Sequence, residues 1–189
     1  MSKGKIIVIS APSGCGKSTI INSILDSGEF PLNFSVSATN RPPRPDEEHG
    51  VHYYFLTTDE FRNAISDGEF VEWEEVYPGR YYGTLRSELD RMISEGLNVI
   101  VDIDVKGAIN VKKQYGDLAR TIFVEPPSID ALRKRLEARG TDTPELIDMR
   151  INRAEYELSF APQFDTRVVN DNLQTAVAET EGIISEFIK

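Results

Sequence analysis

The chain has 189 residues, of which 40% are hydrophobic and 28% are charged. These proportions fit one folded unit with a sizeable core and exclude a disordered chain. A net charge of -10 excludes broad binding to nucleic acid or anionic membranes, and a single cysteine excludes an internal disulfide framework. No apolar stretch reaches the ~20 residues of a membrane span, and residues 1–5 lack the layout of a signal peptide. We therefore expect a cytoplasmic protein without nucleic-acid or membrane partners.

Buried strands alternate with helices along much of the chain. Residues 5–10 form a β-branched run typical of a strand buried on both faces, and a glycine-bearing turn leads into an amphipathic helix over residues 17–25. Residues 98–102 and 120–124 repeat the strand pattern, with helical stretches between the strands. This alternation predicts an α/β fold with a central parallel sheet flanked by helices.

Two segments depart from this pattern. Residues 34–84 are aromatic and of short period around one helix near residues 58–66, which predicts a small, mostly β insertion. Residues 129–159 are highly charged and helical, with a break at which Gly140 suits the end of one helix and Pro144 the start of the next. We expect this second segment to be a mobile helical lid.

The rest of the chain is expected to form the core of a single domain. Its last elements are a strand over residues 164–170 and a closing helix over residues 173–188. The predicted core comprises residues 1–33, 85–128 and 160–189.

The turn after the first strand carries a phosphate-loop pattern, with alanine in place of the first glycine. Gly14 and Gly16 let successive backbone N–H groups converge on phosphate oxygens, Lys17 adds a positive charge, and Ser18 offers a hydroxyl to magnesium. A turn of this kind can also serve only to reverse the chain, but the strand before it and the helix after it favour nucleotide binding. We expect ATP to bind along Ala11, Pro12, Ser13, Gly14, Cys15, Gly16, Lys17, Ser18 and Thr19.

Cys15 is the unusual residue of this loop. The simpler interpretation is that its small side chain fills space. The alternative is that the N-terminus of the following helix lowers the pKa of the thiol and makes it reactive. In that case alkylation of Cys15 should block ATP binding.

Arg41 and Arg44 indicate a second anion site, because they stand in a segment stiffened by prolines. A stiff segment loses less entropy when two guanidinium groups bind one anion. Hydroxyl groups of Tyr53, Tyr81 and Tyr82 in the same insertion could complete a cage around a phosphate. An isolated arginine is usually a solvated surface charge, but the pair between prolines favours binding.

Further motifs along the chain are more selective than the phosphate loop. They are residues 35–55, Phe70-Val71-Glu72-Trp73, Tyr81-Tyr82-Gly83-Thr84, residues 102–108, Arg135-Leu136 with Arg139-Gly140-Thr141, and Val168-Val169-Asn170-Asp171. In this order, and over residues 5–188, the chain resembles the guanylate kinase family. The resemblance implies a P-loop NTPase fold in which residues 34–84 bind GMP and residues 129–159 form the lid. It also implies Mg²⁺-dependent transfer of the γ-phosphoryl group of ATP to GMP.

The resemblance implies a role for each matching residue. The guanine is expected to lie among Ser37, Glu72, Thr84 and Asp104. The phosphate of GMP is expected at Arg41, Arg44, Tyr53 and Tyr82. The phosphates of ATP are expected at Lys17, Arg135, Arg139 and Arg150. Asn170 matches the position that the family uses near the adenosine.

The chemistry of guanine agrees with two of these residues independently. Guanine carries donors at N1 and N2 beside an acceptor at O6, so the carboxylates of Glu72 and Asp104 fit the donors and a hydroxyl fits the acceptor. Adenine lacks the N2 amine and would leave a carboxylate unpaired, which can discriminate by factors on the order of 10⁴. Composition alone would place Glu72, which lies in an acidic run, on a solvated strand face.

Asp102 ends the apolar run of its strand, so we expect it at the carboxyl edge of the sheet beside the phosphate loop. A carboxylate in this place can organise magnesium together with the hydroxyl of Ser18. The alternative is that Asp102 only terminates the strand.

Phosphoryl transfer to GMP needs no strong general base, because the acceptor is already an ionised phosphate oxygen. Catalysis can then rest on positioning and on neutralisation of charge. Arg135 and Arg139 share one helix face, where their charges repel by ~0.2–0.5 kcal/mol unless an anion or an acidic neighbour compensates. Glu137 and Asp142 could compensate in the empty protein, whereas we expect a lid that closes over ATP and excludes water.

Two other functions remain open at this point. A catalytically silent guanylate-kinase-like module that binds proteins usually lacks parts of the phosphate loop, whereas Lys17 and Ser18 are present here. A kinase for another nucleoside monophosphate is disfavoured by Glu72 together with Asp104. Asn40 stands where the family often has threonine. The sequence leaves the oligomeric state and the tolerance of dGMP undecided.

Overall fold

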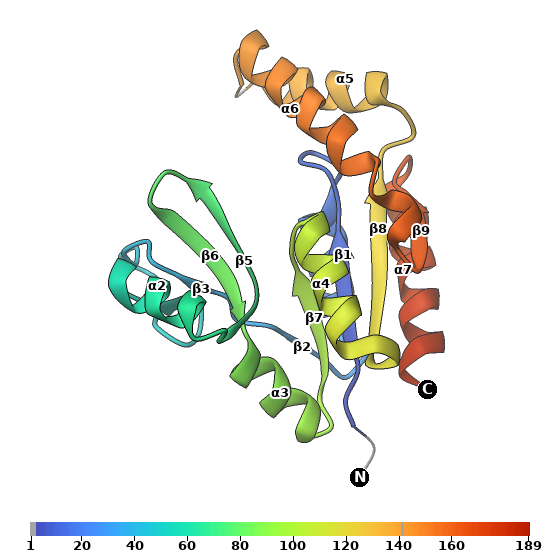
Figure 1. Cartoon of the computed structure of the whole chain (residues 1–189). Helices are drawn as coiled ribbons and strands as arrows, with labels where there is room; N and C mark the ends of the chain where they lie inside the picture. The colour runs from blue at the N-terminus through green and yellow to red at the C-terminus, as the bar shows by residue number, and fades with distance from the viewer. Residues whose placement is uncertain (1–2, 141) are drawn as a thin grey trace.

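A five-stranded parallel sheet forms the centre of the computed structural model (Figure 1), which describes residues 3–140 and 142–189. Its strands are β1 (Ile6–Ser10), β2 (Leu32–Phe34), β7 (Asn98–Asp102), β8 (Ala119–Glu125) and β9 (Thr166–Val169). The strand order is β2-β7-β1-β8-β9, and Ile7 of the middle strand lies opposite Ile100 and Arg120. The predicted α/β fold with a central parallel sheet is confirmed.

Helices cover both faces of this sheet. They are α1 (Lys17–Ser27) and α7 (Leu173–Ile188) on one face, and α3 (Arg86–Ser94) and α4 (Val105–Tyr115) on the other. Successive strand residues point to opposite faces, so Ile7 and Ile9 pack towards the first pair and Ile6 and Val8 towards the second. All of β1 is buried, and its carboxyl end is thereby fixed where the phosphate loop begins.

A second, smaller sheet stands beside the first (Figure 1). It consists of β3 (Ala38–Thr39), β4 (Tyr54–Phe55), β5 (Phe70–Tyr77) and β6 (Arg80–Leu85) in the order β4-β3-β6-β5, with helix α2 (Thr58–Ser66) packed on it. Thr57 and Glu60 form a capping box at the start of α2. The Phe61 ring stacks on the rings of Phe70 and Tyr81, with centroids 4.4 and 5.5 Å away. This aromatic core explains why the insertion is a packed, mostly β unit.

A pair of helices lies beyond the carboxyl ends of β1 and β8 (Figure 1). They are α5 (Ile129–Arg139) and α6 (Pro144–Leu158). Gly140 ends α5 in the left-handed conformation with φ of 64°, and Thr143 caps α6, whose first residue is Pro144. Leu132, Leu136, Ile147 and Ile151 form an apolar cluster with Cys15 of the phosphate loop. The helical pair is therefore anchored on the loop.

Four elements differ in length from the sequence prediction. Strand β1 begins one residue later than predicted, and β8 extends one residue further at each end. The first helix continues to Ser27 and ends at Gly28, which has φ of 64°. The last strand is shorter than residues 164–170, because Asp165 accepts hydrogen bonds from the backbone and side chain of Thr121 and the strand begins only after it. Among residues 3–140 and 142–189, no helix is long and apolar enough to cross a membrane.

Candidate functional site

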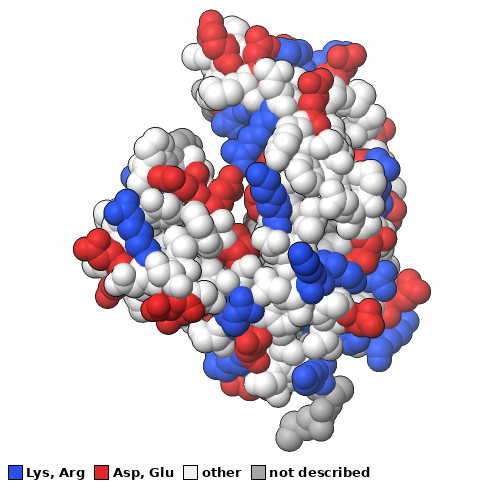
Figure 2. Space-filling view, viewed as in Figure 1, with Lys and Arg blue, Asp and Glu red and all other residues white. Residues whose placement is uncertain are grey.

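A cleft of about 740 Å³ opens between the central sheet, the second sheet and the helical pair. Figure 2 shows it as a hollow with basic side chains along the core and acidic side chains on the facing wall. Its volume is typical of small-molecule sites, which measure ~300–1,000 Å³. The residues of the phosphate loop line it, and the other expected site residues that line it are Ser37, Tyr53, Glu72, Tyr82, Asp102, Asp104, Arg139 and Arg150.

The phosphate loop is shaped by two glycines and braced by one asparagine. Gly14 and Gly16 have φ of 94° and 84°, a region that other residues rarely adopt. Asn170 donates from Nδ2 to the Cys15 carbonyl oxygen at 2.8 Å, and a Cβ at Gly16 would lie 2.5 Å from that nitrogen. Helix α1 begins at Lys17 without a side-chain cap, so its first N–H groups and its positive dipole end remain available to an anion.

Arg135 and Asn170 lie together beside the main cleft. Both line a second pocket of about 440 Å³, which also includes Asp171 and Leu173. Arg135 donates to the carbonyl oxygens of Asn170 and Asp171 at 2.8 and 3.2 Å, so it docks α5 on the chain after β9. The sequence suggested phosphate and adenosine contacts for these two residues, but gave no sign of their bracing contacts, which join segments far apart in the chain.

Lys17 and Asp102 meet at the edge of the central sheet, in the cleft that Ser18 also lines. Asp102 is the last residue of β7, as expected, and its carboxylate forms an ion pair with the Lys17 ammonium. The Ser18 hydroxyl lines the same cleft. Mg²⁺ prefers oxygen ligands and usually takes one or two from protein and the rest from water and substrate phosphates, so Ser18 and Asp102 fit this ion. Among the described residues, no three His, Cys, Asp or Glu side chains are grouped to hold a metal alone.

The two carboxylates expected at a purine base meet over Gly107. Thr84 donates from Oγ1 to Glu72 Oε1 at 2.6 Å, and Asp104 caps α4 by accepting from Gly107 N at 2.7 Å. A Cβ at Gly107 would lie 3.0 Å from Asp104 Oδ1 and 3.1 Å from Glu72 Oε2. The absence of a side chain at Gly107 therefore lets the two acids approach. Thr84 is buried and supports Glu72, although it does not line the cleft.

Glu72 titrates near neutrality. Desolvation raises the pKa of its carboxyl to about 7, and the negative charge of Asp104 adds to this effect, although the hydrogen bond from Thr84 opposes it. The alternative prediction, that Glu72 lies on a solvated strand face, is wrong because the Glu72 side chain lines the cleft. A cleft carboxyl with such a shift and a specific charged neighbour is a typical functional group.

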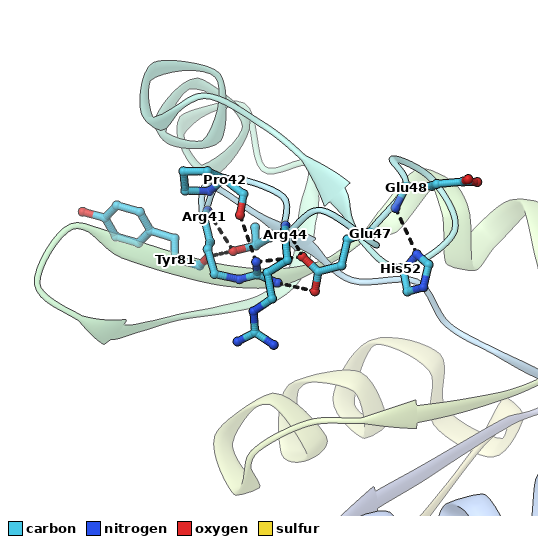
Figure 3. A network of polar contacts seen from close by, with 8 residues as sticks. Arg41, Pro42, Arg44, Glu47, Glu48, His52 and Tyr81 are labelled. Carbon is cyan, nitrogen blue, oxygen red and sulfur yellow. Dashed lines mark hydrogen bonds and ion pairs between the residues drawn. The ribbon is translucent and has the colours of Figure 1, made fainter.

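Arg41 is held by an acidic partner in the loop between β3 and β4 (Figure 3). Its two Nη atoms donate to the two carboxylate oxygens of Glu47, both at 2.8 Å. The Arg44 backbone N–H also donates to Glu47, while the Arg44 guanidinium points away from this network. The rings of Tyr53 and Tyr82 lie 5.9 Å apart, and the Arg41 guanidinium lies 5.4 Å from the Tyr53 ring. Arg41, Tyr53 and Tyr82 are thus gathered, with Glu47 bound to the Arg41 guanidinium. Tyr81 does not join them, because its ring stacks on Phe61 in the core of the second sheet.

Two arginines of the helical pair reach the cleft. Arg150 donates to Ser13 Oγ of the phosphate loop at 2.7 Å and forms an ion pair with Asp142 at 3.1 Å. Arg139 lines both the cleft and the second pocket. Asp142 therefore pairs with Arg150, and among the described residues neither Glu137 nor Asp142 forms an ion pair with Arg135 or Arg139.

Cys15 is a packing residue. It is 1% exposed and lies in the apolar cluster with Leu132 and Leu136. Burial raises the pKa of its thiol to about 12, which is opposite to the shift that a reactive thiol requires. The simpler interpretation is confirmed, and the reactive alternative is wrong.

Three charged residues of the cleft were missed by the sequence analysis. Arg153 of α6 donates from Nε to Glu157 at 2.9 Å and from Nη2 to Glu74 of β5 at 3.1 Å. All three side chains line the cleft, and Glu157 is 7% exposed. The available signals were an acidic run around Glu74 and an i,i+4 charge pair in a helix, and both are equally typical of solvated surfaces.

Comparison with known proteins agrees with this geometry. The guanylate kinase family model matches residues 3–187. The guanylate kinase of Bacteroides thetaiotaomicron is 57% identical over 98% of this chain and 90% of its own length, and that of Porphyromonas gingivalis is 53% identical over 97% and 98%. A crystal structure of guanylate kinase from Anaplasma phagocytophilum has a TM-score of 0.74 and 29% identity, covering 100% of this chain and 89% of that one. The chain therefore belongs to the guanylate kinase family.

Proposed function

We propose that this guanylate kinase binds ATP at the phosphate loop and GMP or dGMP at the Glu72–Asp104 end of the same cleft, and produces ADP together with GDP or dGDP. The observation that carries the proposal is the asymmetry of the cleft. One end offers backbone N–H groups and Lys17, which suit phosphates, and the other offers two carboxylates, which suit a base with adjacent donors. A cleft of this kind can bring two nucleotides together in line.

The parts of the fold then have separate roles. Residues 34–84 would bind GMP, and residues 129–159 would cover ATP. The remaining residues, 1–33, 85–128 and 160–189, would form the frame that carries the phosphate loop.

Recognition of guanine would depend on the charged form of Glu72. Its Oε1 already accepts from Thr84, which leaves Oε2 for the N1 and N2 donors of the base, with Asp104 beside it. Ser37 lines the same end of the cleft and can offer a hydroxyl to O6. Adenine would leave these carboxylates unpaired, and this mismatch supports a preference for GMP.

The phosphate of GMP would bind at Arg41, Arg44, Tyr53 and Tyr82. Glu47 binds both Nη atoms of Arg41 and so fixes the direction of the guanidinium group. A phosphate is the same kind of bidentate acceptor, so it can replace the Glu47 carboxylate at the Arg41 guanidinium. The Arg44 guanidinium can join it from the same loop.

The phosphates of ATP would bind along the loop from Ala11 to Thr19, with Lys17, Arg139 and Arg150 as cations. Lys17 would leave Asp102 for the phosphates, because a polyanion attracts the ammonium more strongly than one carboxylate does. Ser18 and Asp102 would hold Mg²⁺, which supplies neutralisation of charge on the phosphate oxygens. Arg135 would keep α5 docked, and Asn170 would hold the loop and line the adenosine side.

The chain's own residues then catalyse by position and charge. The acceptor oxygen of GMP is already ionised, so no side chain needs to remove a proton from it. Lys17, Arg139 and Arg150 stabilise the charge that spreads over the transferring group, and closure of the helical pair excludes water that would hydrolyse ATP.

A coupled assay of ADP release, with GMP, dGMP, AMP, UMP and dTMP offered in turn, tests the proposal. We expect turnover with GMP or dGMP only, and loss of at least about 100-fold in Lys17→Met, because Lys17 supplies a full charge to the transferring group. Preference for another acceptor, or an unchanged mutant, would overturn it.

A cytoplasmic location and a role in purine nucleotide metabolism and GMP recycling are part of the same proposal. Both proposed substrates are nucleotides of the cell interior, and the net charge of -10 disfavours nucleic acid and anionic membranes as partners. Cell fractionation with detection of the chain tests the location.

A further inference from the structure

Arg153 connects two parts of the fold that face each other across the cleft. Helix α6 belongs to the helical pair and β5 to the second sheet (Figure 1). Arg153 Nη2 forms an ion pair with Glu74 Oε1 at 3.1 Å, although these residues lie far apart in the chain. Among the ion pairs of the described residues, this is the one that joins the helical pair to the second sheet.

The other contact of Arg153 fixes its direction. Its Nε donates to Glu157 Oε1 at 2.9 Å, one turn further along α6. Glu157 is almost fully buried, and its Oε2 has no hydrogen-bond partner among the described residues. An i,i+4 pair of this kind orders the long arginine side chain, so that less entropy is lost when its other end reaches Glu74.

The contact on β5 lies next to the proposed base site. Glu74 and Glu72 are separated by one residue, so they share a face of the strand, and both line the cleft. A tie at Glu74 therefore limits how far the strand that carries Glu72 can move from the helical pair.

We propose that Arg153 is a positioning residue that ties α6 to β5 and so limits how far the strand that carries Glu72 can move away from the helical pair. The proposal rests on the GMP site proposed above. The Arg153 side chain is 53% exposed and that of Glu74 is 37% exposed, so the tie is weak and can open for nucleotide exchange. Arg135 and the apolar cluster around Leu136 keep the helical pair on the core when the tie opens.

Equilibrium binding of GMP without ATP tests the tie through three variants and a control. Arg153→Met and Glu74→Ala should each raise the dissociation constant of GMP about 2- to 5-fold, which is the scale of one exposed ion pair. The double variant should be no weaker than the single variants, because both remove the same contact. Glu74→Ala keeps the Arg153–Glu157 pair and so separates the tie from any effect of unpairing Glu157. The matched control is Arg133→Met, which breaks the ion pair with Asp148 inside the helical pair and should change nothing.

A distance measurement gives a readout that needs no nucleotide. Spin labels at the exposed positions Asn152 of α6 and Arg80 of β6, introduced through cysteine, should show a broader and longer distance distribution in Glu74→Ala than in the unmodified enzyme. The native Cys15 is buried, so it reacts with the label more slowly than the two exposed cysteines do.

Several results would overturn the tie. Additive effects of Arg153→Met and Glu74→Ala, an effect of Arg133→Met of equal size, or unchanged label distances would each do so. Failure of the unmodified enzyme to bind GMP would instead remove the proposed substrate, and the label distances would still decide whether the tie exists.

Discussion

In the proposed GMP site, Glu72 would make recognition of the base sensitive to pH. The pKa of its carboxyl is raised to about 7 by desolvation and by Asp104. Only the carboxylate form accepts from both donors of guanine, so binding must become stronger as this group loses its proton. Other groups, including the phosphate of GMP, also titrate nearby, and a variant without the carboxyl isolates the contribution of Glu72.

We expect kcat/KM for GMP to rise through about pH 7, and Glu72→Gln to remove this part of the rise. The variant should lose about 10- to 100-fold in kcat/KM for GMP above neutrality, the scale of one hydrogen bond to a charged group. Profiles of both proteins in the same buffers check this. An equally steep rise in Glu72→Gln would show that another group is responsible.

The same shift has a consequence for stability. The folded-state pKa of Glu72 lies above its ordinary value of 4.5, so the folded protein favours the protonated form. This stabilisation is fully present below about pH 4.5 and is lost as pH rises through about 7. Glu72→Gln should therefore unfold at a higher urea concentration than the unmodified protein at about pH 8. The gain in the free energy of unfolding should be at most about 3 kcal/mol there and smaller at about pH 5. A difference that does not grow with pH contradicts this prediction.

Gly107 is a second residue whose role follows from the space around it. Alanine stabilises a helix interior relative to glycine by about 1 kcal/mol, but here its Cβ would lie between Glu72 and Asp104. We expect Gly107→Ala to weaken GMP binding about 10-fold or more, because the acids must move apart, and to leave ATP binding unchanged. Gly182→Ala in α7 is the control, since nothing lies within 4 Å of a Cβ there. Calorimetric titration of both variants with each nucleotide gives the comparison.

At the scale of elements, the helical pair depends on a small apolar cluster for its position. Leu136 is fully buried and packs against the Gly14 backbone, where a Cβ would lie 2.9 Å from Leu136 Cδ2. The cluster therefore joins the folding of α5 and α6 to the shape of the phosphate loop.

We expect Leu136→Ala to cost about 2–5 kcal/mol locally, because it leaves a cavity in this cluster. Amide hydrogen exchange should become faster in α5 and α6 while the central sheet stays protected, and ATP binding should weaken more than GMP binding. Leu89→Ala in α3, also fully buried, is the matched control and should affect the sheet instead. Uniformly faster exchange in both variants would show that the helical pair has no separate stability.

The elements themselves were largely predictable from the sequence, for reasons of local chemistry. The strand over residues 98–102 is found with the predicted bounds because its apolar run is buried on both faces, and the break at Gly140 and Pro144 falls where their backbone preferences place it. The pairing of the second sheet was not predictable. Strand β3 has two residues, and these pair in parallel with β4 and antiparallel with β6, a choice that no local pattern encodes.

At the scale of the whole molecule, the sequence identified most of the charged residues that line the cleft but not the contacts that they make with one another. Lys17 is paired with Asp102, Arg41 with Glu47 and Arg150 with Asp142, so three of the cations expected at a phosphate have an acidic partner. Such pairs depend on the distance between segments after folding, which composition and spacing do not determine. For the same reason the contact of Arg153 with β5 could not be read from the chain.

Because Cys15 is buried under the helical pair, the rate at which its thiol reacts reports how often this pair opens. A maleimide can reach the sulfur only when the helices above it lift, and a pKa of about 12 keeps the thiol inert until then. The alkylation rate therefore depends on how often the helical pair opens. ATP should lower this rate in proportion to the fraction of molecules that bound ATP keeps closed. A covalent inhibitor aimed at this sulfur would have to wait for the enzyme to open.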